Sequence, residues 1–158
     1  QVNQLRTFGA GPPWLSPLQP VIDALCAWSF IVMGNTMRML LGLVERKNAI
    51  DQSGLWSSDS ETYLAEFTKE LAEVEEALST GSVAHLEDEL GDVLWDYLNL
   101  LQCLSAEKNI SISSVFERAL QKYEERISGL ENGILWKETK EKQKKRLHEE
   151  SLLERDST

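Results

Sequence analysis

Four acidic residues stand in two pairs with the same spacing. Glu70 precedes Glu73 by three residues, and Glu89 precedes Asp92 by the same interval. Residues three apart on a helix lie on neighbouring turns of one face, so each pair directs two carboxylates the same way. If two such helices pack side by side, four carboxylates converge.

Carboxylates held this close repel one another, and removing each from water costs free energy. Such a cluster persists only with a bound cation or with raised pKa values. Oxygen donors suit hard cations, and Mg²⁺ commonly joins a few protein carboxylates to waters and to phosphate oxygens. The spacing is therefore compatible with a magnesium site, and the alternative is that these acidic faces are simply solvated, as most such faces are.

Each pair belongs to a longer polar stripe beside an apolar one. Glu66 extends the first stripe, and the second contains His85, Asp96 and Asn99 in addition to its acidic pair. Asn99 could therefore orient a ligand or a water, with a hydrogen bond inside the core as the alternative.

Other metal centres fit this sequence poorly. A di-iron bundle would need a glutamate three residues before each of two histidines, and neither His85 nor His148 has one. Cys26 and Cys103 form no C-x-x-C motif, so a zinc site is not expected. Both cysteines are typical of reduced core residues in a cytoplasmic protein.

The elements that must position these residues are all helical. Helices are predicted over residues 21–49, with a break near Gly34, and over 58–79, started by a capping box of Ser58 and Glu61. The predicted core stripe of the second helix is Leu64, Phe67, Leu71, Val74 and Leu78.

A turn over residues 80–82 separates this helix from a third, over residues 83–107. A fourth is predicted over residues 113–130. The fold class is therefore all-α, resembling a four-helix bundle, with an irregular arm over residues 1–19, a domain over 20–133 and a charged helix or tail over 134–158. Residues 50–59 form a loop that carries Trp56, which could stack on a nucleobase or simply pack.

Composition limits the partners. The 158 residues carry a net charge of −10, which argues against electrostatic binding to nucleic acid or to anionic lipid. The apolar stretch Val21 to Met33 contains Asp23 and is too short to span a bilayer, so we expect no membrane span. No signal peptide is evident, so a cytoplasmic location is expected. Position 1 is Gln, so a natural start lies upstream or at Met33 or Met37.

The acidic motifs resemble those of MazG-like nucleoside triphosphate pyrophosphohydrolases, an all-α group. The likeness lies in ELAEVEEAL from Glu70, in ELGDVL from Glu89, and in KYEER from Lys122 to Arg126. Leu55-Trp56 is similar to a C-P-W segment of the family, although the cysteine and proline are missing here. The resemblance covers about residues 38 to 131.

This resemblance implies hydrolysis of a nucleoside triphosphate to the monophosphate and pyrophosphate. Glu70, Glu73, Glu89 and Asp92 would hold Mg²⁺, or Mn²⁺ in its place, and one of them would accept a proton from the attacking water. Lys122 and Arg126 would bind phosphates, while Asn99, Trp56 and Asp96 are candidate substrate contacts. The resemblance also implies a role in clearing or adjusting nucleotide pools.

Three alternatives remain at this point. The same fold group includes phosphoribosyl-ATP and dUTP-type pyrophosphohydrolases, and a non-catalytic helical oligomerisation module would also carry acidic faces. The resemblance further implies a homodimer or homotetramer. The apolar segment Ala24 to Met33 is a candidate interface, with burial inside the subunit as the alternative.

Overall fold

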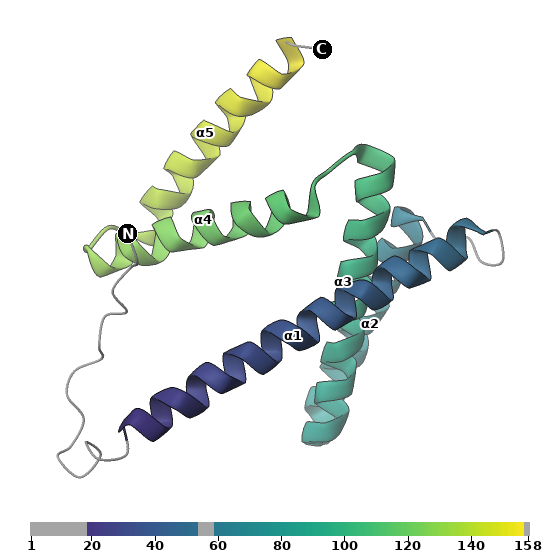
Figure 1. The fold of residues 1–158 in the computed structure, drawn as a ribbon. Helices are drawn as coiled ribbons and strands as arrows, with labels where there is room; N and C mark the ends of the chain where they lie inside the picture. The colour runs from purple at the N-terminus through teal and green to yellow at the C-terminus, as the bar shows by residue number, and fades with distance from the viewer. Residues whose placement is uncertain (1–18, 54–58, 157–158) are drawn as a thin grey trace.

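The chain is built from helices alone throughout the part that the structure describes. This structure is a computed structural model, and it describes residues 19–53 and 59–156. Figure 1 shows its five helices, which are α1 (Gln19–Gln52), α2 (Ser60–Thr80), α3 (Val83–Lys108), α4 (Ile112–Glu131) and α5 (Trp136–Asp156). The predicted all-α bundle class is confirmed. The arm over residues 1–18 and Trp56 lie outside the described residues.

Helices α2 and α3 form an antiparallel hairpin, which is the most extensive helix pairing in the chain (Figure 1). Gly81 ends α2 with a φ of 70°, a left-handed conformation that glycine adopts without strain. The Ser82 side chain then accepts a hydrogen bond from the backbone N–H of His85 and caps α3. Gly81 and Ser82 therefore form the turn that was predicted over residues 80–82.

The start of α2 differs from the prediction. Asp59, not Ser58, is the N-cap, and its carboxylate accepts a 2.8 Å hydrogen bond from the backbone N–H of Thr62. Aspartate caps as well as serine and its charge also suits the helix dipole, so the cap moves one residue along. The backbone N–H of Ser60 donates 2.9 Å to the Glu107 carboxylate and so joins the two ends of the hairpin.

Helix α1 crosses the hairpin with its C-terminal half (Figure 1). It passes through Gly34 without the predicted break, and it extends to Gln52 into the predicted loop. Lys47 lies at the crossing and donates to both carboxylate oxygens of Asp51, at 2.8 and 2.6 Å, and to the Tyr63 hydroxyl of α2 at 3.0 Å. This network ties α1 to α2.

The core formed by these three helices is small. Its buried apolar side chains are Val44, Tyr63, Ala77, Leu98, Leu101 and Cys103. The prediction that Cys26 is also a core residue is wrong, because the half of α1 that carries it has no helix packed over it.

The predicted core stripe of α2 is largely exposed. Leu64, Leu71 and Leu78 are 57%, 45% and 62% exposed, whereas Tyr63 and Ala77 face the interior. Periodicity correctly indicated an amphipathic helix but not which neighbour would cover it, because α3 packs against the adjacent face. Three leucines at seven-residue spacing are thus left as an unpartnered apolar row on α2, called here the leucine row.

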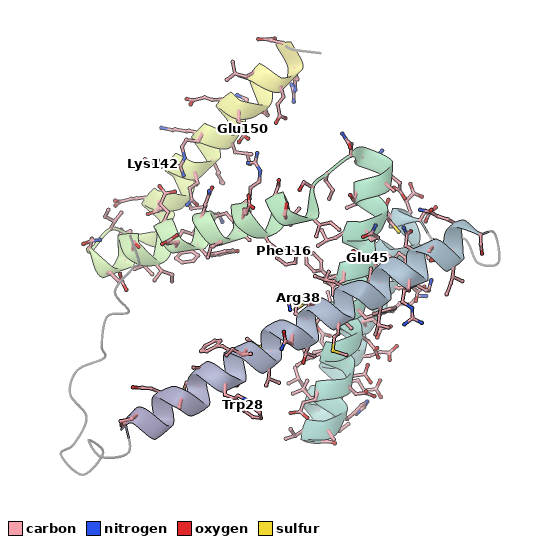
Figure 2. All side chains as sticks on the ribbon, in the orientation of Figure 1. Trp28, Arg38, Glu45, Phe116, Lys142 and Glu150 are labelled. Atoms are coloured by element: carbon pink, nitrogen blue, oxygen red, sulfur yellow. The ribbon has the colours of Figure 1, made fainter. Side chains whose placement is uncertain are left out.

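The N-terminal half of α1 is exposed as well. Trp28, Phe30, Ile31 and Met33 are all exposed, and Figure 2 shows Trp28 on this half of the helix. The alternative that the segment Ala24 to Met33 is buried inside the subunit is therefore wrong for these side chains.

Part of α1, Cys26–Gln52, is long and apolar enough to cross a membrane by length and composition alone. The apolar stretch is longer than the sequence pattern indicated because the helix continues past Gly34. Length and hydropathy do not separate a membrane span from a helix that packs on another protein surface.

Helix α4 leaves the hairpin after meeting α3, and α5 packs back on α4 (Figure 1). The two helices approach closely at their joint, where a Cβ on Gly129 would lie 2.9 Å from the Thr139 hydroxyl. Tyr123, Ile127 and Leu130 are exposed because α4 does not lie along the hairpin. The charged C-terminal segment is a helix.

Replacing Leu98 tests the small core. Leu98 is 1% exposed, so Leu98→Ala leaves a cavity that nearby side chains cannot fill. We expect a loss of about 3 kcal/mol in the free energy of unfolding, measured by urea denaturation. Leu135→Ala, at a position 64% exposed, is the matched control and should change stability by less than about 0.5 kcal/mol. Equal effects would contradict the assigned core.

Candidate metal centre

Three of the predicted carboxylates converge. Glu70 and Glu73 of α2 and Glu89 of α3 each present an oxygen, and these oxygens lie within 4.8 Å of one another. Glu89 is buried, Glu70 is half-buried and Glu73 is exposed, so the group opens to solvent at one side. We call these three residues the acidic cluster.

The hairpin explains why the acidic cluster forms. The short turn at Gly81 places α2 and α3 antiparallel, so the acidic stripe that leads into the turn faces the stripe that leads out of it. The three-residue spacing then puts Glu70 and Glu73 on neighbouring turns, opposite Glu89. Local helix signals and one tight turn are enough to bring these side chains together.

Asp92, the fourth predicted ligand, lies beside the acidic cluster but is not within that group of three. Its negative charge reaches Glu70, whose pKa is raised above its ordinary value. Partial removal of the Glu70 carboxyl from water is the main cause, followed by the charges of Glu73 and Asp92. A bound cation would offset the repulsion among these carboxylates and favour their ionised form.

His85 contacts a member of the acidic cluster, and the sequence pattern was not used to predict this contact. Its Nε2 lies 2.9 Å from a carboxylate oxygen of Glu89, one helical turn further along α3. The four-residue spacing of these residues could have revealed this contact. The contact helps to orient the Glu89 carboxylate.

Asp96 is the most unusual acid of the stripe. It is 7% exposed, and among the described residues its Oδ2 has no hydrogen-bond partner. Burial raises the pKa of the Asp96 carboxyl, and the charges of Glu66 and Asp92 raise it further, while Lys69 acts in the opposite direction. Lys69 itself forms a 2.5 Å ion pair with Glu66. The stripe predicted the position of Asp96, but only the packing of α3 shows its burial.

Asn99 ends this stripe inside the core. It is buried, and its side-chain amide donates a 2.8 Å hydrogen bond to the backbone carbonyl of Trp95. This bond uses one of the two N–H groups of the amide and corresponds to the core alternative that the sequence left open.

Lys122 and Arg126 lie on α4, on the side that faces α5. The Arg126 Nε donates 2.8 Å to the Gln143 side chain of α5, and its guanidinium lies 5.0 Å from the ring centre of Trp136. In the described part of the chain, neither basic residue forms an ion pair with the acidic cluster. Within one chain, therefore, the two predicted phosphate-binding residues lie apart from the predicted metal ligands.

The acidic cluster suits a hard divalent cation. All three donors are carboxylate oxygens, the type that Mg²⁺ and Mn²⁺ prefer. Ligands on opposite sides of Mg²⁺ lie about 4.2 Å apart, given bonds of about 2.1 Å. A spread of 4.8 Å or less is therefore within a small side-chain adjustment of that geometry. The exposed side of Glu73 leaves room for waters or phosphate oxygens.

Comparison with known proteins agrees with the motif analysis. The family model described as the MazG nucleotide pyrophosphohydrolase domain matches residues 58–129. The match includes α2, α3 and most of α4, and hence every member of the acidic cluster. Neither the curated proteins nor the solved structures gave a match.

Asp96 predicts a pH dependence of stability. Because the pKa of Asp96 is higher in the folded state than its ordinary value of 3.8, the folded protein holds this proton more tightly than the unfolded chain. The protonated Asp96 carboxyl therefore contributes to folding stability at low pH. This stability is lost as the pH rises from the unfolded-state pKa through the higher folded-state pKa. Asp96→Asn should therefore stabilise the metal-free protein at pH 7 by about 1 kcal/mol, and less as the pH falls toward 4.

Urea denaturation in EDTA at several pH values measures this difference. Asp88→Asn is the matched control, because Asp88 is an exposed aspartate of the same helix. Destabilisation by Asp96→Asn at pH 7 would show that the ionised carboxylate makes a favourable contact in the folded state.

Proposed function

We propose that this protein hydrolyses nucleoside triphosphates to the monophosphate and pyrophosphate with the help of Mg²⁺, because residues 58–129 match the model of the MazG nucleotide pyrophosphohydrolase domain. The observation that carries the proposal is the convergence of Glu70, Glu73 and Glu89 from two helices. Deoxynucleotides or non-standard nucleotides are the proposed substrates, and removal of unwanted nucleotides is the proposed role.

The acidic residues have two tasks in this reaction. Glu70, Glu73, Glu89 and Asp92 would hold the cation, which supplies positive charge to the triphosphate and makes a bound water more acidic. One of these carboxylates accepts the proton of the water that attacks the α-phosphorus. The bond between that phosphorus and the bridging oxygen breaks, and pyrophosphate leaves with the bond's electrons.

Asp96 has a supporting place in this proposal. Its Oδ2 has no partner among the described residues and is buried near the charges of Glu66 and Asp92, so a hydrogen-bond donor from a substrate or a water would satisfy it. Asn99 and Trp56 remain candidate substrate contacts, and Trp56 lies outside the described residues. Lys122 and Arg126 keep a proposed role in phosphate binding, on α4.

Activity measurements test the proposal directly. Pyrophosphate release from a panel of ribonucleoside and deoxyribonucleoside triphosphates should require Mg²⁺ and stop in EDTA. Glu73→Gln should lower release by about 100-fold or more, because it removes one charged ligand. Glu75→Gln, an exposed acid of the same helix outside the acidic cluster, should leave the rate nearly unchanged.

Metal binding is separable from turnover. Mg²⁺ that binds only the folded state should raise the melting temperature of the wild-type protein, and by less in Glu73→Gln. A folded protein that shows no metal effect and releases no pyrophosphate would favour a non-catalytic helical module. A metal effect without release from this panel would direct attention to phosphoribosyl-ATP as substrate.

We also propose that the functional unit is a homodimer or homotetramer. The leucine row on α2 and the apolar half of α1 expose several large apolar side chains, and surfaces of this kind commonly mark contacts between protein chains. A second copy is the proposed cover for both, which would also complete the sparse core around the acidic cluster. The proposal includes a cytoplasmic location, with neither nucleic acid nor a membrane as partner.

Light scattering measures the assembly. The wild-type mass should be two or four times 17.9 kDa. Leu71→Lys places a charge in the leucine row and should shift the protein toward the monomer. Leu135→Lys makes the same change at an exposed position in the loop before α5 and should leave the mass unchanged. A monomeric wild-type protein would refute the proposed assembly.

A further inference from the structure

His85 lies beside the acidic cluster, in the first turn of α3. Its Nε2 is 2.9 Å from Oε1 of Glu89, which lies one helical turn further along. A nitrogen of the imidazole ring can donate a hydrogen to a carboxylate oxygen, and this separation is that of a hydrogen bond. Among the described residues, Glu89 is the only member of the acidic cluster with a basic side chain within ion-pair distance.

The two side chains of this contact differ in burial. The Glu89 side chain is 11% exposed, whereas the His85 side chain is 43% exposed. A carboxylate that is largely withdrawn from water depends on protein groups for its hydrogen bonds and hence for its orientation. Because a half-exposed ion pair adds little to folding stability, we expect the main effect of His85 to be on the direction of the Glu89 carboxylate.

The backbone of His85 is fixed by the turn that precedes it. Its N–H donates to Oγ of Ser82 at 3.3 Å, which sets the first turn of α3. The four-residue interval then places His85 and Glu89 on neighbouring turns of one face. The turn that brings Glu89 opposite α2 therefore also places the His85 ring beside it.

We propose that His85 is a positioning residue of the metal centre, which holds Oε1 of Glu89 and leaves the second carboxylate oxygen for a divalent cation. A carboxylate can bind a cation through one oxygen or through both. Binding through both oxygens is common for Ca²⁺, which accepts flexible geometry, whereas Mg²⁺ requires a near-ideal octahedron. By restricting Glu89 to one oxygen, His85 would favour Mg²⁺ and Mn²⁺ over Ca²⁺.

This inference rests on the proposed function, because it concerns the same metal centre. It deepens that proposal by naming a residue outside the four predicted ligands that determines which cation is bound. Groups that hydrogen-bond to a metal ligand commonly change metal affinity by about 10-fold to 100-fold when they are removed.

Calorimetric titration of the full chain with Mn²⁺ or Ca²⁺, without nucleotide, tests the role of His85. His85→Ala should weaken Mn²⁺ binding by about tenfold and Ca²⁺ binding by about threefold or less. His85→Gln should restore Mn²⁺ affinity to within about threefold, because its amide nitrogen reaches about as far as Nε2. His85→Asn carries the same amide on a shorter side chain and should not restore it. His148→Ala removes the other histidine, on α5, and is the matched control.

Two further measurements separate positioning from a structural role. The melting temperature in EDTA should be nearly the same for the wild-type protein and for His85→Ala, because the contact adds little to stability. In a Glu89→Gln background, His85→Ala should weaken Mn²⁺ binding by less than about twofold more, since His85 acts through Glu89.

The outcomes distinguish this role from the proposed reaction. Mn²⁺ binding that His85→Ala leaves unchanged or tightens would overturn the role of His85 and leave the proposed function intact. A loss that persists in the Glu89→Gln background would overturn it as well, and equal weakening of Mn²⁺ and Ca²⁺ would overturn binding through one oxygen. A folded wild-type protein that binds no Mn²⁺ would overturn both the role of His85 and the metal-dependent reaction.

Discussion

Repulsion among carboxylates at the hairpin of α2 and α3 is the constraint on which the rest of the structure depends. Three carboxylate oxygens lie within 4.8 Å of one another, and partial burial together with the neighbouring charges raises the pKa of Glu70. The hairpin tolerates this repulsion because its turn, its caps and its buried residues, such as Leu98, hold the two helices together. A cation would turn the same arrangement from a destabilising feature into a binding site.

Acidic and basic side chains are concentrated in different helices of the chain. The hairpin concentrates negative charge, and a groove between α4 and α5, lined by Lys122, Arg126 and other basic side chains, concentrates positive charge, although the total remains −10. A divalent cation is attracted to negative charge, and a phosphate is attracted to positive charge. Because α4 and α5 diverge from the hairpin after α3, the two regions lie apart (Figure 1). The leucine row and the apolar half of α1 are uncovered, and we propose that a second copy packs on them.

Much of the fold and part of the candidate site could be predicted from the sequence. The three-residue spacing of Glu70 and Glu73 fixes their shared face, and Gly81 with Ser82 fixes the turn that brings Glu89 opposite. These are short-range features set by helix geometry and turn chemistry. Direct contact of Asp92 with that group was expected as well, but a side chain's position within a stripe does not determine how closely it approaches the neighbouring helix.

The sequence by itself determined that the chain is helical, that its acidic pairs share a face, and that residues 58–129 match the model of a nucleotide pyrophosphohydrolase domain. Only the tertiary structure decided which apolar rows are covered, that Asp96 is buried without a partner for Oδ2 among the described residues, and that Arg126 faces α5. Periodicity sets the faces of one helix, whereas burial depends on contacts between helices distant in sequence. Those contacts leave no local pattern to recognise.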